Sequence, residues 1–180
     1  MLLRLTILNI LLILVLSCEN QPIPILVKER KPQKLDKNLS IELNSQWIKD
    51  EAFRINQYCI RQGWNTKSTN SGLKYIVLQD VHNTNSPKAG DQVLISYDVR
   101  LMDPQKTSCY HSDSNGLAKF TIDQSTVESG LHEVITYLNK GDSALVILPH
   151  YLAHGITGDS QKIPPLSSVL YYIKIIDVLN

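Results

Sequence analysis

Five short runs rich in β-branched and aromatic residues limit the fold of this chain more strongly than its other features. Such runs predict β-strands, and a sheet built from them needs another element to cover its apolar face. Residues 83–91 contain Asn, Pro and Gly, which predicts a turn between the first run and the second. The runs are Leu73–Leu78, Val93–Leu101, Lys119–Ile122, Ala144–Leu148 and Val169–Ile176.

A segment of helical periodicity lies between the third run and the fourth, and its apolar residues are Val127, Leu131, Ile135 and Leu138. Ser125 and Glu128 have the spacing of a capping box, which predicts a helix that begins at Ser125 and ends before Gly141. Residues 40–65 carry a second apolar stripe at helical spacing. The sequence therefore predicts an α+β fold, with an antiparallel sheet of about five strands wrapped around a central helix and preceded by an N-terminal helix.

The first residues have the order of a signal peptide, because Arg4 precedes the apolar run Leu5–Leu16 and Ser17 follows it. The run is shorter than the roughly 20 apolar residues that span a bilayer, so we expect cleavage rather than a permanent transmembrane helix. Val15–Cys18 resembles a bacterial lipobox, which implies cleavage before Cys18 and acylation of that residue. An ordinary secretory signal that happens to end at a cysteine is the alternative.

These features divide the chain into a signal peptide at residues 1–17, a tether at 18–39, the helix at 40–65 and a folded domain at 72–180. The tether contains three prolines and five basic residues, which is typical of an extended linker. Its basic residues favour solubility, with contact to anionic headgroups as the alternative. We expect a lipid-anchored protein of the cell envelope, on the periplasmic or surface side of the outer membrane.

The formal net charge of +1, and a sequence without a basic patch interleaved with aromatic residues, argue against nucleic acid as a partner. Two cysteines follow the lipobox, and their separation in sequence does not establish a disulfide. We expect Cys59 and Cys109 to be unpaired, inert thiols.

Seven motifs follow one another in the order Pro87–Val93, Tyr97, Val127–Leu131, Gly141–Asp142, Leu152–Gly155, Ile163–Pro165 and Val169–Tyr171. This ordered set resembles the FK506-binding-protein type (FKBP-type) of peptidyl-prolyl isomerase. The resemblance covers roughly residues 72–179, with an insertion after Asp103 and a one-residue deletion in the Ala144–Leu148 run. Two further stretches, Ile60–Trp64 and Ser71–Tyr75, resemble the gliding-motility-associated lipoprotein branch of that family in the Bacteroidetes.

The activity that this resemblance implies is rotation about the peptide bond before proline. The rotation breaks amide resonance over a barrier of about 20 kcal/mol, and it requires no nucleophile, metal or cofactor. An apolar pocket favours the twisted amide because the carbonyl dipole shrinks as resonance is lost, and a hydrogen-bond donor orients the peptide. We therefore expect no cofactor.

The resemblance implies a proline pocket whose catalytic residues are Tyr97, His154 and Tyr171. His154 takes the place of a tyrosine whose hydroxyl donates to a substrate carbonyl, and an apolar pocket favours its neutral imidazole. Leu131 stands where the family often has tryptophan, which implies a deeper pocket with lower affinity for proline. The implied substrate-binding residues are Tyr110, Phe120, Val127, Glu128, Leu131 and Ile163.

Three positions of the implied pocket depart further from the family. Tyr110 is the nearest aromatic residue to a Phe-Asp pair that has no clean counterpart after the insertion. Ala118 stands where a larger pocket residue is common, and Phe120, two residues later on the same face, is placed to compensate. Glu128 replaces an apolar residue that offers its backbone N–H, a role that does not depend on the side chain.

His150 and His154 lie four residues apart and suggest a zinc site. Pro149 and Gly155 disfavour a long helix that would place both rings on one face, and no third ligand is evident, so we expect no metal.

Three functions fit this sequence. The first is a membrane-tethered isomerase that acts on proline-containing exported polypeptides. The second is a binding or chaperone module with little turnover, because of the departures at Leu131, Ala118 and His154. The third is a subunit of a motility or secretion apparatus.

Overall fold

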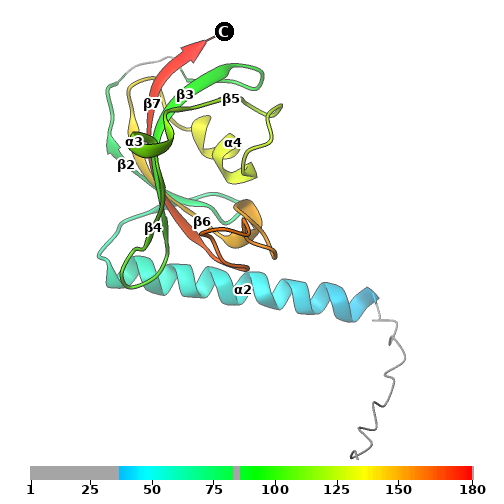
Figure 1. Cartoon of the computed structure of the whole chain (residues 1–180). Helices are drawn as coiled ribbons and strands as arrows, with labels where there is room; N and C mark the ends of the chain where they lie inside the picture. The colour runs from blue at the N-terminus through cyan, green and yellow to red at the C-terminus, as the bar shows by residue number, and fades with distance from the viewer. Residues whose placement is uncertain (1–36, 83–85, 180) are drawn as a thin grey trace, which may run out of the picture. The chain divides into compact units, whose positions relative to one another are not determined.

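The structure is a computed structural model that describes residues 37–82 and 86–179 (Figure 1). The expected signal peptide, the lipobox residue Cys18 and the tether up to residue 36 lie outside these residues. Among the described helices, none has both the length and the apolar character needed to span a membrane.

Seven strands of the described chain form one antiparallel sheet. Six of them follow the order β1-β2-β6-β7-β3-β4, and β5 lies off this path. The last strand of the sheet order, β4, pairs with the C-terminal half of β3, and β5 pairs with its N-terminal half. All five predicted strands are present, and β1 and β4 are additional. The strands are β1 (Lys67–Ser68), β2 (Lys74–Gln79), β3 (Gln92–Leu101), β4 (Ser108–His111), β5 (Ala118–Thr121), β6 (Ser143–Leu148) and β7 (Val169–Leu179).

Four helical segments accompany the sheet in the described residues. A long helix precedes it, and α4 lies inside its curve (Figure 1). The predicted α+β fold, with an antiparallel sheet around a central helix and a helix before it, is confirmed. The segments are α2 (Lys37–Arg61), α3 (Ser112–Asn115), α4 (Ser129–Ile135) and the 3₁₀ turn η1 (His150–Leu152).

The main core lies between α4 and the inner face of the sheet. Leu131, Val134 and Ile135 of α4 are buried against alternate residues of three central strands. Because strand side chains alternate between faces, every second residue enters this core. The strand residues are Val93, Ile95, Val99, Ala144, Val146, Leu148, Val169, Tyr171, Ile173 and Ile175.

The outer face of β6 and β7 is also covered. The unbroken apolar run of β6 has side chains for both faces, and the intervening residues Leu145 and Ile147 pack against the C-terminal part of α2. The N-terminal part of α2 extends beyond the sheet (Figure 1). The second cluster contains Ile55, Tyr58, Cys59, Leu145, Ile147 and Leu170.

The predicted start of the central helix at Ser125 is wrong, because α4 begins at Ser129 with Glu128 as its N-cap residue. The Ser125 hydroxyl instead accepts a hydrogen bond from the Thr121 N–H at 2.9 Å and closes a turn after β5. The Glu128 side chain makes no capping bond to the helix. Gly130 permits α4 to approach β6, since a Cβ there would lie 2.5 Å from the Leu148 side chain.

Both cysteines after the lipobox are free and buried, as expected. Burial raises the pKa of the Cys59 thiol and of the Cys109 thiol, so little reactive thiolate forms near neutral pH.

Candidate functional site

The register of the sheet brings three strands together at the floor of a cavity. Ile95, Tyr97 and Val99 follow one another on the inner face of β3. Val99 pairs with Tyr110 of β4 on one side and with Tyr171 of β7 on the other. Two aromatic residues that are 61 positions apart in sequence therefore flank the same strand residue and line one cavity.

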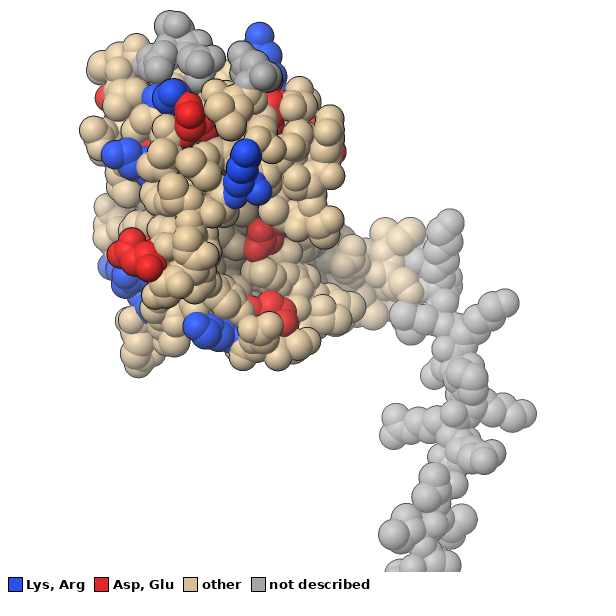
Figure 2. All heavy atoms as spheres, turned by 45° about the horizontal axis from the view of Figure 1, so that its top comes forward, with Lys and Arg blue, Asp and Glu red and all other residues tan. Residues whose placement is uncertain are grey.

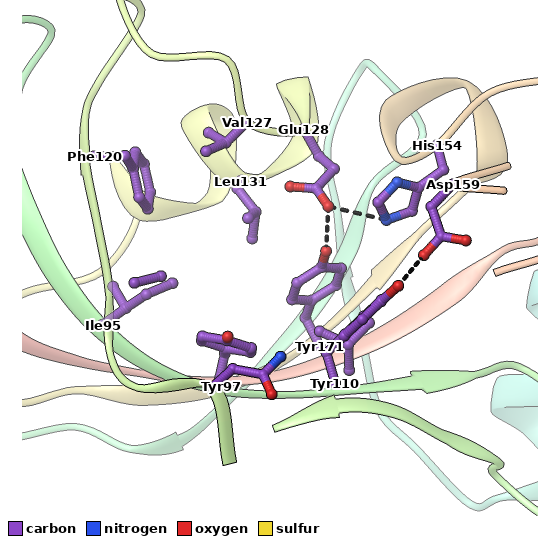
Figure 3. Close-up of a pocket in the computed structure, with 13 residues that line it drawn as sticks. Ile95, Tyr97, Tyr110, Phe120, Val127, Glu128, Leu131, His154, Asp159 and Tyr171 are labelled. Carbon is purple, nitrogen blue, oxygen red and sulfur yellow. Dashed lines mark hydrogen bonds and ion pairs between the residues drawn. The ribbon is translucent and has the colours of Figure 1, made fainter. Parts of the chain in front are cut away.

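The cavity has a volume of about 340 Å³ and a divided lining (Figure 3). Phe120, Val127 and Leu131 form an apolar half with Ile95, whereas the polar groups lie on the other side. Ala118 and Asn115 complete the lining next to β5. A cavity of this size, mostly apolar with a few convergent polar groups, is typical of a binding site for a small side chain or ligand.

Glu128 holds together two other side chains of the polar half (Figure 3). Its Oε1 atom accepts a hydrogen bond from the Tyr171 hydroxyl at 2.5 Å and lies 3.0 Å from Nε2 of His154. Burial alone would raise the pKa of Glu128, but His154 and Tyr171 outweigh it and lower that pKa. Burial and the adjacent Glu128 raise the pKa of Tyr171 well above its ordinary value, so this phenol remains a donor.

A second polar pair, Tyr110 and Asp159, lies at the edge of the cavity. The Tyr110 hydroxyl donates to Oδ2 of Asp159, and this bond raises the pKa of Tyr110 to about 12. Burial would raise the pKa of Asp159, but the Tyr110 bond and backbone N–H groups lower it to about 2. Asp159 is therefore ionised at neutral pH.

The expected direction of the His154 pKa shift is wrong. The apolar surroundings were expected to favour a neutral ring, but the adjacent Glu128 raises the pKa of His154 despite partial burial. The Nε2 atom faces Glu128, so it is not a free donor toward a substrate carbonyl. Only the backbone N–H of Glu128 was expected to contribute to the site, but its side chain also lines the cavity and contacts Tyr171 and His154.

The structure brings together eight of the nine residues that the sequence predicted for the site, and Ala118 lies with them. The exception is Ile163, which is buried in the main core and does not line the cavity. The eight are Tyr97, Tyr110, Phe120, Val127, Glu128, Leu131, His154 and Tyr171.

Sequence reasoning missed four lining residues: Ile95, Val99, Asn115 and Asp159. The alternation of β3 places Ile95 and Val99 on the face of Tyr97, a signal that was available. Asp159 follows a glycine, and its Oδ1 atom accepts hydrogen bonds from three backbone N–H groups of its own loop. Aspartate of this kind predicts a turn, but its contact with Tyr110 depends on the fold.

The two histidines of the rejected zinc hypothesis do not act together. His154 lines the cavity, whereas Nδ1 of His150 lies against the carboxylate of Glu51 of α2. Among the described residues, no group of three or more His, Cys, Asp or Glu side chains is arranged to hold a metal ion.

Acidic and basic side chains are interspersed on the face of the molecule that Figure 2 presents.

Comparison with known proteins gives a consistent assignment. The sequence profile of the family described as FKBP-type peptidyl-prolyl cis-trans isomerase matches residues 83–176. The probable FKBP-type peptidyl-prolyl cis-trans isomerase FkpA of Neisseria meningitidis is 29% identical over 130 residues, which are 72% of this chain and 45% of that protein. This chain therefore spans less than half the length of that relative.

One further relative is similar in sequence, and one solved structure is similar in fold. The peptidyl-prolyl cis-trans isomerase Fkbp12 of Drosophila melanogaster is 28% identical over 107 residues, which are 59% of this chain and 98% of that protein. The crystal structure of FkpA from Escherichia coli has the same fold, with a TM-score of 0.61 and 24% identity, covering 79% of this chain and 67% of that one. Since the family profile matches more than half of its residues, this chain belongs to the family of FKBP-type peptidyl-prolyl cis-trans isomerases.

Proposed function

We propose that this protein catalyses cis-trans isomerisation of X-Pro bonds in exported polypeptides. The observation that carries the proposal is the cavity of about 340 Å³ between β3, β7 and α4, apolar on one side and polar on the other. Its apolar half suits a proline ring. Because the twisted amide has the smaller carbonyl dipole, these walls stabilise it more than the planar amide.

The donor that orients the substrate is better assigned to Tyr97 than to His154. The Tyr97 side chain lines the cavity, and its hydroxyl has no hydrogen-bond partner among the residues that the structure describes. The Nε2 atom of His154 and the hydroxyls of Tyr110 and Tyr171 face carboxylates. Tyr97 is therefore free to donate to a carbonyl of the bound peptide.

A protease-coupled assay with X-Pro peptides tests this proposal. The purified protein should accelerate cis-to-trans conversion well above the spontaneous rate, which takes tens to hundreds of seconds. Tyr97→Phe should keep the wall of the cavity but lower catalytic efficiency by roughly threefold to tenfold, since it removes one hydrogen bond. No acceleration with any X-Pro peptide would refute the proposal.

A binding or chaperone module with little turnover is the second candidate. It is favoured by Leu131 and Ala118. Both residues line the cavity, but neither side chain offers a flat surface on which proline could stack. A protein with this function would slow aggregation of an unfolded client while showing little turnover in the peptide assay.

The cellular setting is a separate proposal. The lipobox at Cys18 supports attachment to the cell envelope, on the periplasmic or surface side of the outer membrane. The resemblance of Ile60–Trp64 and Ser71–Tyr75 to the gliding-motility-associated branch supports a link to a motility or secretion apparatus. Affinity capture of the intact protein from solubilised membranes tests this link, and recovery without any subunit of such an apparatus would contradict it.

A further inference from the structure

The Glu128 carboxylate has one atom that the site does not use. Its Oε1 atom contacts both Tyr171 and His154, whereas no hydrogen bond to Oε2 occurs among the described residues. Figure 3 shows this second oxygen turned toward the apolar half of the cavity, on the side of Leu131. An ionised acceptor therefore faces the space in which a peptide would bind.

Glu128 also differs from the other acidic residue of the cavity in how its charge is balanced. Asp159 accepts hydrogen bonds from three backbone N–H groups and from the Tyr110 hydroxyl. The ammonium group of Lys162 lies 5.0 Å from the centre of the Tyr110 ring. Glu128 forms an ion pair with His154, whose positive charge disappears when the ring loses its proton. Glu128 is thus the anion that remains available to a ligand.

A bound peptide would cover the free oxygen and remove it from water. A peptide without a donor at that point would leave a buried carboxylate oxygen unpaired, which is costly. A peptide with a cationic side chain there would replace the lost water with a charge-assisted hydrogen bond. A site built around a polar partner discriminates strongly against ligands that lack that partner.

We propose that this pocket selects X-Pro segments with a lysine or arginine next to the proline, through the free Oε2 atom of Glu128. This inference rests on the proposed binding of X-Pro segments in the cavity and adds the substrate class. It concerns the side chain at position 128 and does not require a particular catalytic rate.

A peptide series tests the selection directly. Peptides that differ only at the residue before proline carry lysine, norleucine, alanine or glutamate, and a second series varies the residue after proline. Norleucine is the matched control because it keeps the lysine alkyl chain without the ammonium group. Binding is measured by fluorescence anisotropy and turnover by the protease-coupled assay. In one of the two series, lysine should exceed norleucine by about fivefold, and glutamate should be the weakest.

Two variants assign the effect to its source. Glu128→Gln should remove the preference for lysine over norleucine, and circular dichroism checks that it is folded. Glu42→Gln changes the same net charge on an exposed position of α2 and should keep the preference. Because the interaction is electrostatic, the preference in the unmodified protein should also fall as salt is added.

The outcomes separate this inference from the proposed function. Equal binding of lysine and norleucine peptides in both series, or a preference that survives Glu128→Gln, overturns the inference even if the protein is an active isomerase. Tighter binding of lysine peptides without turnover supports the inference while contradicting the catalytic function.

Discussion

The ion pair between His154 and Glu128 joins the loop after β6 to the start of α4, and its strength depends on pH. Glu128 raises the pKa of His154 above the ordinary 6.5. The contribution of His154 to stability is therefore complete below pH 6.5 and is lost as pH rises through the raised pKa. Burial opposes ionisation of Glu128, but His154 and Tyr171 lower its pKa below 4.5, so its contribution is lost only as pH falls through the lowered value. The pair therefore stabilises the fold most between pH 4.5 and 6.5.

His154→Ala should consequently destabilise the protein by an amount that varies with pH. The ring is partly exposed and solvent screens the pair, so we expect a loss of about 0.5 to 1 kcal/mol near pH 5.5, declining at alkaline pH. Denaturant unfolding of both proteins between pH 4 and pH 9 measures this difference. A difference that stays constant over that range would show that the ring contributes packing alone.

Tyr171→Phe tests the other contact of Glu128. The variant keeps the buried ring but removes the hydroxyl that donates to Oε1 at 2.5 Å, so we expect a loss of about 1.5 to 3 kcal/mol in the free energy of unfolding at pH 7. Tyr172→Phe is the matched control, because the Tyr172 hydroxyl has no hydrogen-bond partner in the described part of the chain. Equal stability of the two variants would contradict the assigned hydrogen bond.

At the scale of elements, long periodic runs were predictable and short polar ones were not. The five predicted strands have enough β-branched and aromatic residues to identify them without the fold. Strand β4 and α3 are only four residues each, and their sequence is largely polar. The capping-box prediction failed because Ser125 bonds to Thr121 and Glu128 bonds across the cavity, so tertiary contacts displaced a local one.

The loop between β6 and β7 depends on a glycine. A Cβ at Gly158 would lie 2.2 Å from the Ile163 carbonyl oxygen, and its φ of 67° is in the left-handed region. Gly158→Ala should therefore cost more than about 3 kcal/mol of stability, since backbone must shift. Gly155 has a similar φ of 66° but nothing within 4 Å of the added Cβ, so Gly155→Ala should cost about 1 to 2 kcal/mol. Thermal or denaturant unfolding ranks the two, and the opposite ranking would contradict the clash.

Glu51 connects α2 to both ends of the same loop. Its Oε1 atom accepts hydrogen bonds from the His150 N–H at 2.8 Å and the Ser168 hydroxyl at 2.6 Å, and the residue is 1% exposed. Glu51→Leu leaves both donors without this acceptor, so we expect a loss of about 2 to 4 kcal/mol. Glu51→Gln keeps one oxygen and should cost less, while the exposed Asp50→Ala should change stability by under about 0.5 kcal/mol. If Glu51→Leu and Asp50→Ala had equal effects in denaturant unfolding, the hydrogen bonds of Glu51 to the loop would not contribute to stability.

At the scale of the whole molecule, the ordered motifs predicted which residues form the cavity but not how they contact one another. Glu128 and Tyr171 are 43 positions apart, and Tyr110 and Asp159 are 49 apart. Such contacts depend on the register of β3 with β4 and β7, which the sequence does not specify by itself. The pKa of His154 was predicted in the wrong direction for a related reason: it is raised by Glu128, the N-cap residue of α4, which is 26 positions away in sequence.

The lipid anchor is the remaining prediction, and it concerns the placement of the whole protein. If Cys18 is the acyl acceptor, its acyl chains supply the membrane affinity, at about 0.8 kcal/mol per buried methylene group. Cys18→Ser should then leave the signal uncleaved or release the protein from membranes, which fractionation and mass spectrometry of the N-terminus distinguish. Cys59→Ser keeps the lipobox intact and should remain with the membrane fraction. A Cys18→Ser protein that is cleaved normally and still sediments with membranes would exclude lipidation at this residue, and another part of the chain would then have to bind the membrane.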